Sequence, residues 1–298
     1  MSSSCIIITA ADDKFLSLTV DLINSIRASH DHKNIDIGVI DVGLKQTSRQ
    51  KLTELGVLIK EAGVDIEYPG RTEYEQALPF IRAMTSRPFI PKYFPGYQVY
   101  VWMDSDTWLQ NGEMLNQVIP RAMGDNALYI SAEFDRDYSL LFASAALWQV
   151  HFNWYKALFP IEIANKMSLR PMLNSGVFAL SANSPVWKIW QKTYSDVMQN
   201  NSVLSSERFM ADQLSLNVAV YTHDLPKHIL PAEYNWLCLH RLPMLDSENG
   251  FYVRPGAPNN KISVLHLAGD IKNLPQKICT TDGKEIEATL TYPARSGF

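Results

Sequence analysis

Short apolar runs alternate with helical patterns in the first part of the chain, and this alternation leaves few folds open. Residues 5–10 form a nearly continuous apolar run of the kind that buried parallel strands show, and apolar side chains recur near helical spacing over 15–26. A second apolar run covers 35–42. Strands that are separated by a helix pair in parallel through right-handed crossovers. The pattern therefore predicts an α/β protein with a mostly parallel central sheet.

The same periodicities predict the elements of the remaining chain. Helices are expected over residues 48–62, 78–86, 114–123, 140–159, 186–198 and 207–221. Further strands are expected over residues 64–68, 98–103, 127–132, 176–181 and 262–267. Because the sequence has no internal repeat, low-complexity stretch or linker, we expect a single domain over residues 1–298, with a regular half at 1–133 and a more irregular half at 134–298.

The composition is that of an ordinary globular protein, with 46% hydrophobic and 19% charged residues among 298. It excludes disordered and collagen-like chains. The net charge is −4 and the sequence has no basic run, so nucleic acid is not expected as a partner. Cys5, Cys238 and Cys279 are odd in number and far apart in sequence, which predicts neither a disulfide framework nor a zinc site and fits the reducing cytoplasm.

The sequence shows no targeting or membrane-spanning segment. Residues 1–8 lack positive charge and their apolar run is too short for a signal peptide. Apolar runs elsewhere reach only five or six residues, whereas a spanning helix needs about 20. The tail at 280–298 holds only the basic residues Lys284 and Arg295, so it has no polybasic patch, and peripheral membrane association stays open.

Two carboxylates flank a serine at the end of a predicted strand. The apolar segment 98–103 runs directly into Asp104-Ser105-Asp106, and ligands of open α/β sheets bind beyond the carboxyl ends of the strands. Acidic side chains this close together repel each other unless a cation lies between them. Mn²⁺ and Mg²⁺ are typically held by one or two carboxylates, substrate phosphate and water. The alternative is a solvated turn, because this short pattern often occurs by chance.

Further short motifs follow in an order that resembles a known enzyme family. They are Thr9-Ala10-Ala11-Asp12-Asp13, Arg87, Leu173-Asn174-Ser175-Gly176-Val177, Asp212-Gln213 and His266-x-x-Gly269-x-x-Lys272. With these motifs, and over residues 6–272, the chain resembles the family 8 glycosyltransferases, which include glycogenin and bacterial lipopolysaccharide galactosyl- and glucosyltransferases. The resemblance implies a Rossmann-like nucleotide-diphospho-sugar transferase fold, a UDP-sugar donor, Mn²⁺ and transfer with retention of configuration. It makes 1–133 the nucleotide-binding half and 134–298 the acceptor-side half that holds the metal-binding histidine strand.

His266 is the candidate third metal ligand beside Asp104 and Asp106, because it follows the apolar run 262–265. A mixed nitrogen and oxygen ligand set suits Mn²⁺ better than Mg²⁺, which is the alternative metal. The competing interpretation is a hydrogen-bonded core histidine. Gly269 and Lys272 at fixed spacing favour the functional interpretation, because a glycine lets the backbone approach a pyrophosphate and a lysine supplies a point charge for it. An ordinary surface lysine is the alternative at position 272.

The resemblance places a uracil base against Ala10 and Ala11, with Asp12 bound to a base N–H. Small side chains leave room for the ring. Asp12 is equally suited to cap the following helix, and both roles can hold together. The lipopolysaccharide enzymes have Asn two residues after this carboxylate, whereas this chain has Lys14, so it departs from the family pattern at a ribose contact.

Four residues are candidates for the chemistry itself: Arg87, Asp212, Gln213 and Lys272. An arginine fork at 87 can hold Asp104 and the donor-sugar hydroxyls at once, with a surface salt bridge as the alternative. By the resemblance, Asp212 and Gln213 adjoin the sugar and its anomeric carbon, where a carboxylate and an amide carbonyl stabilise oxocarbenium-like charge. The alternative is that both are polar residues on an exposed helix face.

The expected reaction is a front-face substitution in which the leaving phosphate accepts the acceptor's proton, while Mn²⁺ and Lys272 stabilise the diphosphate. Asn174 and Ser175 come just before the predicted strand 176–181 and carry the amide and hydroxyl groups that sugar hydroxyls require. Glu133 or Asp135 is a second candidate sugar-binding carboxylate.

The aromatic residues divide into two predicted groups. Trp148, Trp154, Tyr155, Trp187 and Trp190 are expected in the core. The segment Tyr234-Asn235-Trp236 is the better acceptor-site candidate, because carbohydrate sites combine aromatic faces with amides. Many family members have Lys-Pro-Trp where this chain has Lys272-Asn273-Leu274-Pro275, so closure over the donor is expected to differ.

The sequence therefore predicts a metal-dependent retaining hexosyltransferase that uses UDP-glucose or UDP-galactose. The acceptor stays open between a glycan, a lipid-linked saccharide and a protein. One alternative is a non-catalytic module that binds nucleotide sugars or carbohydrate. The other is a sugar nucleotidyltransferase, but such enzymes carry a basic, glycine-rich loop after the first strand, where this chain has acidic residues at 12 and 13.

Overall fold

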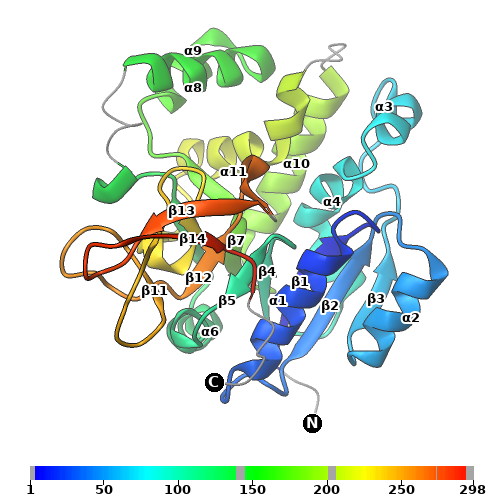
Figure 1. The fold of residues 1–298 in the computed structure, drawn as a ribbon. Helices are drawn as coiled ribbons and strands as arrows, with labels where there is room; N and C mark the ends of the chain where they lie inside the picture. Colours follow the sequence, from blue (N-terminus) through cyan, green and yellow to red (C-terminus); the bar gives the residue numbers. More distant parts are fainter. Residues whose placement is uncertain (1–3, 139–144, 201–205, 273, 293–298) are drawn as a thin grey trace.

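The computed structural model describes residues 4–138, 145–200, 206–272 and 274–292. A seven-stranded sheet lies at its centre, in the strand order β3-β2-β1-β4-β7-β6-β8 (Figure 1). In that order the strands span Leu58–Glu61, Asp36–Asp41, Cys5–Ala11, Val99–Met103, Leu173–Ser181, Leu128–Ala132 and Lys227–Leu230. Only β7 runs antiparallel to its neighbours β4 and β6, so the expected mostly parallel sheet is confirmed.

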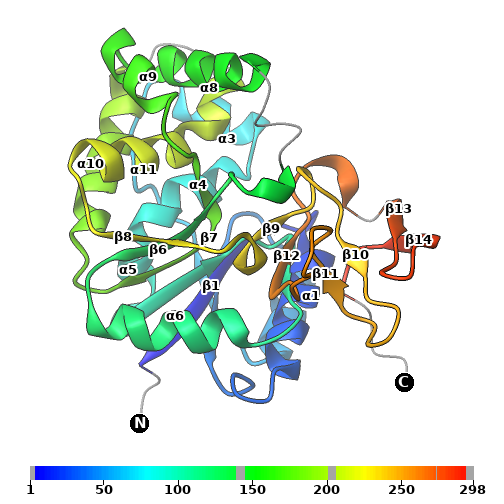
Figure 2. The same ribbon diagram turned by 90° about the vertical axis from the view of Figure 1, so that its left-hand side faces the viewer.

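Helices cover both faces of this sheet, as the two views in Figures 1 and 2 show. One face packs against α1 (Leu16–Ala28), α2 (Gln46–Glu54) and α6 (Glu113–Gly124). The other face packs against α4 (Ile81–Ser86), α10 (Pro185–Asn200) and α11 (Ala211–Thr222). Successive strand residues point to opposite faces, and both faces are buried, which is why β1 is apolar at nearly every position.

The remaining helices lie around the second of these faces and its edge. They are α3 (Arg71–Ala77), α5 (Ile90–Tyr93), α8 (Ala145–Leu158) and α9 (Ile161–Met167). Short 3₁₀ turns are η1 (Arg87–Phe89), η2 (Arg136–Tyr138), η3 (Ser206–Met210), η4 (Ala232–Tyr234) and η5 (Gly269–Ile271). None of the helices in the described part of the chain combines the length and hydrophobicity that crossing a bilayer requires.

A second, three-stranded sheet holds part of the C-terminal half against the end of β4. It consists of β5 (Thr107–Leu109), β12 (Val264–His266) and β9 (Trp236–Leu237), in the order β5-β12-β9. Its own core contains Trp108, Trp236 and Leu265. Two hairpins lie beyond it, β10 (Met244–Leu245) with β11 (Tyr252–Val253) and β13 (Pro275–Cys279) with β14 (Glu285–Thr289).

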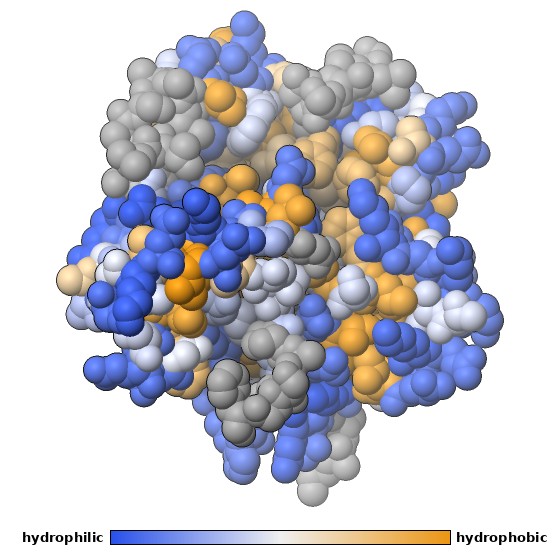
Figure 3. All heavy atoms as spheres, viewed as in Figure 1, coloured by the Kyte–Doolittle hydropathy of each residue, from blue (hydrophilic) through white to orange (hydrophobic). Residues whose placement is uncertain are grey.

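The boundary at residue 133 does not break the main sheet, because β7 and β8 come from the second half and pair with strands of the first. The description of residues 1–298 as one domain, with halves at 1–133 and 134–298, stays a prediction. The outer parts of the face in Figure 3 are mainly hydrophilic, and hydrophobic side chains lie between them toward its recessed middle.

Several local predictions were wrong. The expected helix 48–62 ends at Glu54, and the strand lies at Leu58–Glu61 instead of 64–68. Gly56 in the turn between them has a φ of 70°, a conformation that glycine adopts without strain. The segment 173–175 lies inside β7 and does not merely precede it. Residues 140–144 of the expected helix 140–159 lie outside the described residues, and α8 accounts for its remainder except Phe159.

The expected aromatic core is only partly confirmed. Tyr155, Trp187 and Trp190 are buried at 5% exposure or less, whereas Trp154 is half-buried and Trp148 is 43% exposed and stacks on Phe152. Helical spacing alone does not tell which aromatic side chains face the interior when a helix lies at the edge of the molecule.

Candidate active site

The site is built where β4 ends beside the antiparallel strand β7. Met103 is paired with Val177, so the next residue, Asp104, lies beside Gly176, and its backbone N–H donates to the Gly176 carbonyl at 2.7 Å. A Cβ on Gly176 would lie 2.4 Å from His266 Cε1 and 2.9 Å from Asp104 Oδ2. Glycine is therefore the residue that lets these two side chains approach each other at this point.

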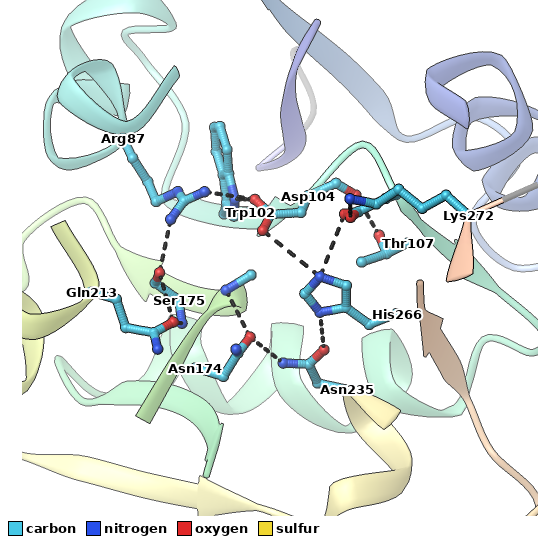
Figure 4. A network of polar contacts seen from close by, with 12 residues as sticks. Arg87, Trp102, Asp104, Thr107, Asn174, Ser175, Gln213, Asn235, His266 and Lys272 are labelled. Atoms are coloured by element: carbon cyan, nitrogen blue, oxygen red, sulfur yellow. Dashed lines mark hydrogen bonds and ion pairs between the residues drawn. The ribbon is translucent and has the colours of Figure 1, made fainter. Parts of the chain in front are cut away.

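His266 reaches the carboxylates through the small sheet. The register of β12 against β5 pairs His266 with Thr107, and the backbone N–H of Leu267 donates to the Asp106 carbonyl at 2.9 Å. Nε2 of His266 then lies 3.4 Å from Asp106 Oδ1 and 3.9 Å from Asp104 Oδ2 (Figure 4). Residues 160 positions apart in the sequence thus meet because two short strands pair.

Asp104, Asp106 and His266 can share one metal ion, because one ligand atom from each lies within 4.8 Å of the others. Asp106 and His266 are buried, whereas Asp104 is partly exposed toward the cavity. The set holds one imidazole nitrogen and carboxylate oxygens, which fits Mn²⁺ and similar divalent cations. The three side chains leave the remaining coordination positions to water or a ligand, as in sites that bind metal together with a phosphate.

The charges at this site depend on one another. Burial opposes ionisation of Asp106, yet the neighbouring His266 and Lys272 hold the pKa of this carboxyl well below its usual range. Burial would lower the pKa of His266, but the facing carboxylates of Asp106 and Asp104 raise it. Lys272 Nζ lies 2.8 Å from Asp106 Oδ2, so it is an ion-paired residue of the site and not an ordinary surface lysine.

Arg87 joins Asp104, one of the candidate metal ligands, to Asp212 of α11. Its Nη2 donates to Asp104 Oδ1 at 2.6 Å, and its Nη1 donates to Asp212 Oδ2 at 2.5 Å and to Ser175 Oγ at 2.8 Å. The guanidinium also lies 4.8 Å from the ring centre of Trp102. Arg87 is only 5% exposed, so the alternative of a surface salt bridge is wrong. One buried cation therefore pairs with one buried carboxylate, Asp212, and one partly exposed carboxylate, Asp104.

Asp212 and Gln213 lie in the first turn of α11, and both are buried instead of lying on an exposed helix face. Burial raises the pKa of Asp212 although Arg87 stabilises the carboxylate. The carbonyl Oε1 of Gln213 accepts from the Ser175 backbone N–H at 2.9 Å, and its Nε2 donates to Glu133 Oε1 at 2.9 Å. In this structure the amide carbonyl that was expected to face developing charge is therefore engaged with β7.

Two cavities meet at the carboxylates. One, of about 290 Å³, is lined by Ala10, Ala11, Asp12 and Ser105 among others. The other, of about 490 Å³, is lined by Glu133, Asn174, Ser175, Asp212, Gln213, His266 and Gly269 among others. The charged residues shared by both cavities are Arg87, Asp104, Asp106 and Lys272. The residues predicted to bind the metal and the donor, or to carry the chemistry, therefore line one or both of two joined cavities.

The model of the family described as "Glycosyl transferase family 8" matches residues 6–272. The chain belongs to glycosyltransferase family 8. It is accordingly a glycosyltransferase, an enzyme, as the sequence predicted. Among curated proteins, none matches the chain at a significant level.

Solved structures show the same fold as this family 8 glycosyltransferase. The bifunctional glycosyltransferase WbbM in its apo form has 19% sequence identity and a TM-score of 0.57, over 91% of this chain and 46% of that one. The chain thus spans less than half of WbbM. The galactosyltransferase LgtC, in complex with donor and acceptor sugar analogues, has 16% identity and a TM-score of 0.53, over 90% of this chain and 88% of that one. At such identities the likeness shows the fold alone, and it confirms the predicted glycosyltransferase fold.

The predicted base-binding residues of the family 8 chain line the smaller cavity. Ala10 and Ala11 end β1 and are buried. Asp12 Oδ1 accepts from the Phe15 backbone N–H at 2.9 Å, one residue before α1 begins, which agrees with the expected role at the helix start. Gly269 has a φ of 80°, so its backbone conformation favours glycine there. Asn273, where the chain departs from the family pattern, lies outside the described residues.

The structure of this glycosyltransferase distinguishes between the two candidate sugar-binding carboxylates, Glu133 and Asp135. Glu133 lines the larger cavity, where burial opposes ionisation but hydrogen bonds from His240, Asn174 and Gln213 lower the pKa of its carboxyl. Asp135 instead bonds to Arg254, which also binds Asp137. Of the two candidates, Glu133 is the one in the cavity. A carboxylate at the end of β6 beside a motif on β7 is the signal that points to it.

The acceptor-site prediction for Tyr234-Asn235-Trp236 was wrong for Trp236, which is fully buried and donates from Nε1 to the Arg241 carbonyl at 2.8 Å. Asn235 is buried as well, and its side chain bonds to His266. Sequence reasoning also missed Trp102, whose Nε1 donates to Asp104 Oδ1 at 2.7 Å. Its position two residues before the first carboxylate, on the same face of the strand, is the signal that could have found it.

Proposed function

We propose that this family 8 glycosyltransferase is a metal-dependent, retaining hexosyltransferase that uses a UDP-sugar of the UDP-glucose or UDP-galactose type. The observation that supports this best is the order of groups across the joined cavities. The cavity lined by small side chains lies on one side, and the cavity lined by buried amides and carboxylates lies on the other. Between them lie the carboxylates of Asp104 and Asp106 with the cationic side chains of Arg87 and Lys272. A nucleotide sugar has the same order of base, diphosphate and hexose.

Asp104, Asp106 and His266 would hold the cation, with Mn²⁺ favoured over Mg²⁺ by the imidazole ligand. When bound, a divalent cation neutralises charge on the diphosphate leaving group. Lys272 lies 2.8 Å from Asp106, so its ammonium is near enough to bind a phosphate oxygen at the same place. Gly269, three residues earlier, brings exposed backbone to this side of the cavity.

The smaller cavity is the proposed base site. Ala10 and Ala11 leave space for a flat ring, and the second carboxylate oxygen of Asp12 is free of the helix-start bond made by Oδ1 in the described structure. A carboxylate accepts hydrogen bonds only, so it suits the N–H of uracil. Lys14 also lines this cavity and is exposed.

The larger cavity is the proposed hexose site, where Arg87 and Asp212 are the central pair. Arg87 donates hydrogen bonds to Asp212 at the cavity wall and to Ser175 beside it. A carboxylate there stabilises positive charge that develops on the anomeric carbon as the bond to the phosphate oxygen breaks. The acceptor oxygen forms its bond to the same face of that carbon, and its proton passes to the departing phosphate oxygen. Retention of configuration follows from attack on this face.

Glu133, Asn174 and Gln213 would bind hexose hydroxyls. Gln213 offers its Nε2 and Asn174 its Nδ2, and both now donate to Glu133 Oε1. A sugar hydroxyl both donates and accepts hydrogen bonds, so it can accept from these amide N–H groups and donate to the carboxylate. The acceptor would enter from the open side of the same cavity, and a glycan, a lipid-linked saccharide and a protein all remain candidate acceptors.

The two alternatives have less support. A non-catalytic binding module would not need the buried ion pair of Arg87 with Asp212 beside the sugar cavity. A nucleotidyltransferase would need a basic loop after β1, but Asp12 and Asp13 lie there. A cytoplasmic location is part of the proposal and rests on the sequence alone, and peripheral membrane association stays open.

A thermal-shift titration tests the proposal without a known acceptor. The protein is heated with UDP, GDP, ADP, UDP-glucose, UDP-galactose and UDP-N-acetylhexosamines, each with Mn²⁺ and with EDTA, because a ligand of the native state raises its apparent stability. We expect a shift confined to uridine nucleotides and dependent on Mn²⁺. A shift with GDP or ADP of equal size, or with UDP in EDTA, would contradict the donor class or the metal dependence respectively.

A further inference from the structure

A continuous series of hydrogen bonds runs from Glu133 through Asn174 and Asn235 to His266, and Figure 4 shows its part from Asn174 to His266. Nδ2 of Asn174 donates to Glu133 Oε1 at 2.7 Å, and Nδ2 of Asn235 donates to Asn174 Oδ1 at 2.9 Å. Nδ1 of His266 lies 2.9 Å from Asn235 Oδ1. All four residues are at most 8% exposed, so water does not compete freely for these bonds. We call this series the amide relay.

The orientation of Asn174 is fixed at two points. The Glu133 carboxylate only accepts hydrogen bonds, so the Asn174 side chain must present its NH₂ group there. The backbone N–H of Gly176 donates to Asn174 Oδ1 at 3.0 Å, so the carbonyl must lie on that side. Reversal of the amide would place two acceptors together and two donors together, both buried, which is costly at each end.

This orientation determines the next two groups. Because Asn174 offers only oxygen lone pairs toward Asn235, the latter must present its NH₂ group, and its Oδ1 therefore faces His266. An oxygen at 2.9 Å accepts, so Nδ1 of His266 must carry a hydrogen. In the neutral ring the lone pair then lies on Nε2, the nitrogen that faces Asp104 and Asp106.

We propose that Asn235 is a positioning residue that holds His266 in the Nδ1–H tautomer and so directs the Nε2 lone pair to the cation. The importance of this role rests on the proposed metal dependence, since a metal-ligating histidine typically donates its other N–H to a fixed acceptor. Asn235 comes from the turn before β9, which pairs with β12 beside His266, so the same small sheet places both the ligand and its partner.

Calorimetric titration of the 298-residue chain with Mn²⁺ alone tests the role of Asn235. Asn235→Leu removes the acceptor for Nδ1–H and should weaken Mn²⁺ binding about 10- to 100-fold, the range found for such outer partners. Asn235→Asp keeps an acceptor for Nδ1–H and should stay within a few-fold of the original protein. If Asn235 contributed only to packing, Asn235→Asp should weaken Mn²⁺ binding more than Asn235→Leu does. The reason is that the aspartate would place a buried carboxylate against Asn174 Oδ1.

Asn217→Ala is the matched control. Asn217 is also a fully buried asparagine, and in the described structure its hydrogen bonds join it to the backbone of Leu173 and Gln213 and to none of Asp104, Asp106 and His266. Its loss should lower stability while Mn²⁺ affinity stays within a few-fold. Equal Mn²⁺ affinity in Asn235→Leu and the original protein would overturn the proposal.

Nitrogen-15 NMR of the histidines in the metal-free, unsubstituted protein determines the tautomer of His266 and does not require any variant to fold. At alkaline pH, where the ring is neutral, His266 should show a protonated Nδ1 and an unprotonated Nε2, and Asn235→Asp should show the same. The opposite tautomer would overturn the proposal. If the protein binds no Mn²⁺ at all, the metal dependence of the proposed function fails, while this spectrum still decides the tautomer.

Discussion

Gly176 and His266 are in contact across the site, because a Cβ on Gly176 would lie 2.4 Å from the Cε1 atom of the imidazole. Gly176 lies within β7, and its backbone conformation is one that any residue adopts. The requirement for glycine is therefore steric and comes from a residue 90 positions later in the sequence. It leads directly to a test of the metal site.

Gly176→Ala should fold yet lose most of its Mn²⁺ affinity. The new methyl group displaces the His266 ring and crowds Asp104 Oδ2, which it would approach to 2.9 Å. We expect at least a tenfold weaker affinity by calorimetric titration, with little change in the circular dichroism spectrum. Gly124→Ala is the control, because nothing lies within 4 Å of its Cβ position, and it should bind Mn²⁺ normally. Unchanged affinity in Gly176→Ala would contradict the site geometry.

Substitutions at Asp106 and Asp212 should affect different steps, the first UDP binding and the second turnover of the UDP-sugar. Asp106→Ala removes a carboxylate that faces both His266 and Lys272, so Mn²⁺-dependent UDP binding should disappear. Asp212→Asn keeps shape but removes the charge beside the proposed anomeric carbon, so UDP binding should persist while hydrolysis or transfer of the hexose falls about 10²- to 10³-fold. The measurements are UDP calorimetry and release of UDP from each UDP-sugar. Full activity of Asp106→Ala would refute the metal assignment.

Arg87→Leu should be among the most destabilising changes in the site. It removes the cation that bonds to both Asp104 and Asp212, and it leaves the buried carboxyl of Asp212 without this charged partner. Breaking such a pair typically costs about 3–5 kcal/mol in the free energy of unfolding. Denaturant unfolding measures this cost. The double variant Arg87→Leu with Asp212→Leu should recover part of the stability, whereas no recovery would argue against the ion pair as the cause.

The stability of the metal-free protein should depend on pH through His266. Burial alone would lower the pKa of this histidine, but Asp106 and Asp104 raise it above the usual value of 6.5. A pKa that is higher in the folded state means that the contribution to stability is complete below about pH 6.5 and is lost as pH rises through the folded value. Thermal unfolding in EDTA should therefore show a falling melting temperature on the alkaline side. His266→Gln should flatten that fall, and an equal fall in both proteins would count against it.

Mn²⁺ should reverse this trend, because the ion competes with a proton for Nε2 of His266. The stabilisation by Mn²⁺, measured as the difference in melting temperature with and without EDTA, should grow as pH rises over the same window. A difference that shrinks with rising pH would contradict coordination by this histidine. The Asp106 carboxyl, whose pKa is lowered in the folded protein, should lose its contribution only at acidic pH, below its usual value of 3.8.

The amino-acid sequence was enough to predict the mostly parallel sheet, which the structure confirms, and to propose candidate residues for the site. Apolar runs such as 5–10 and 98–103 are typical of strands buried on both faces, and Asp104-Ser105-Asp106 follows one of them where such sheets bind ligands. Each motif is local, so its residue types could be read without coordinates. The ends of the helix and strand near residues 54–68 could not be predicted in this way, because short exposed strands such as β3 carry little periodic signal.

Which of those residues are in contact follows from the pairing of distant strands and not from any local sequence pattern. The antiparallel insertion of β7 beside β4 places Gly176 against Asp104, and the pairing of β12 with β5 places His266 against Asp106. Pairing between distant strands depends on how the whole chain packs, and no local pattern records it. For the same reason the contact of Asn235 with His266 could not be predicted from the sequence. Asn235 was expected to bind the sugar acceptor, but its side chain is buried and bonds to the histidine that it orients.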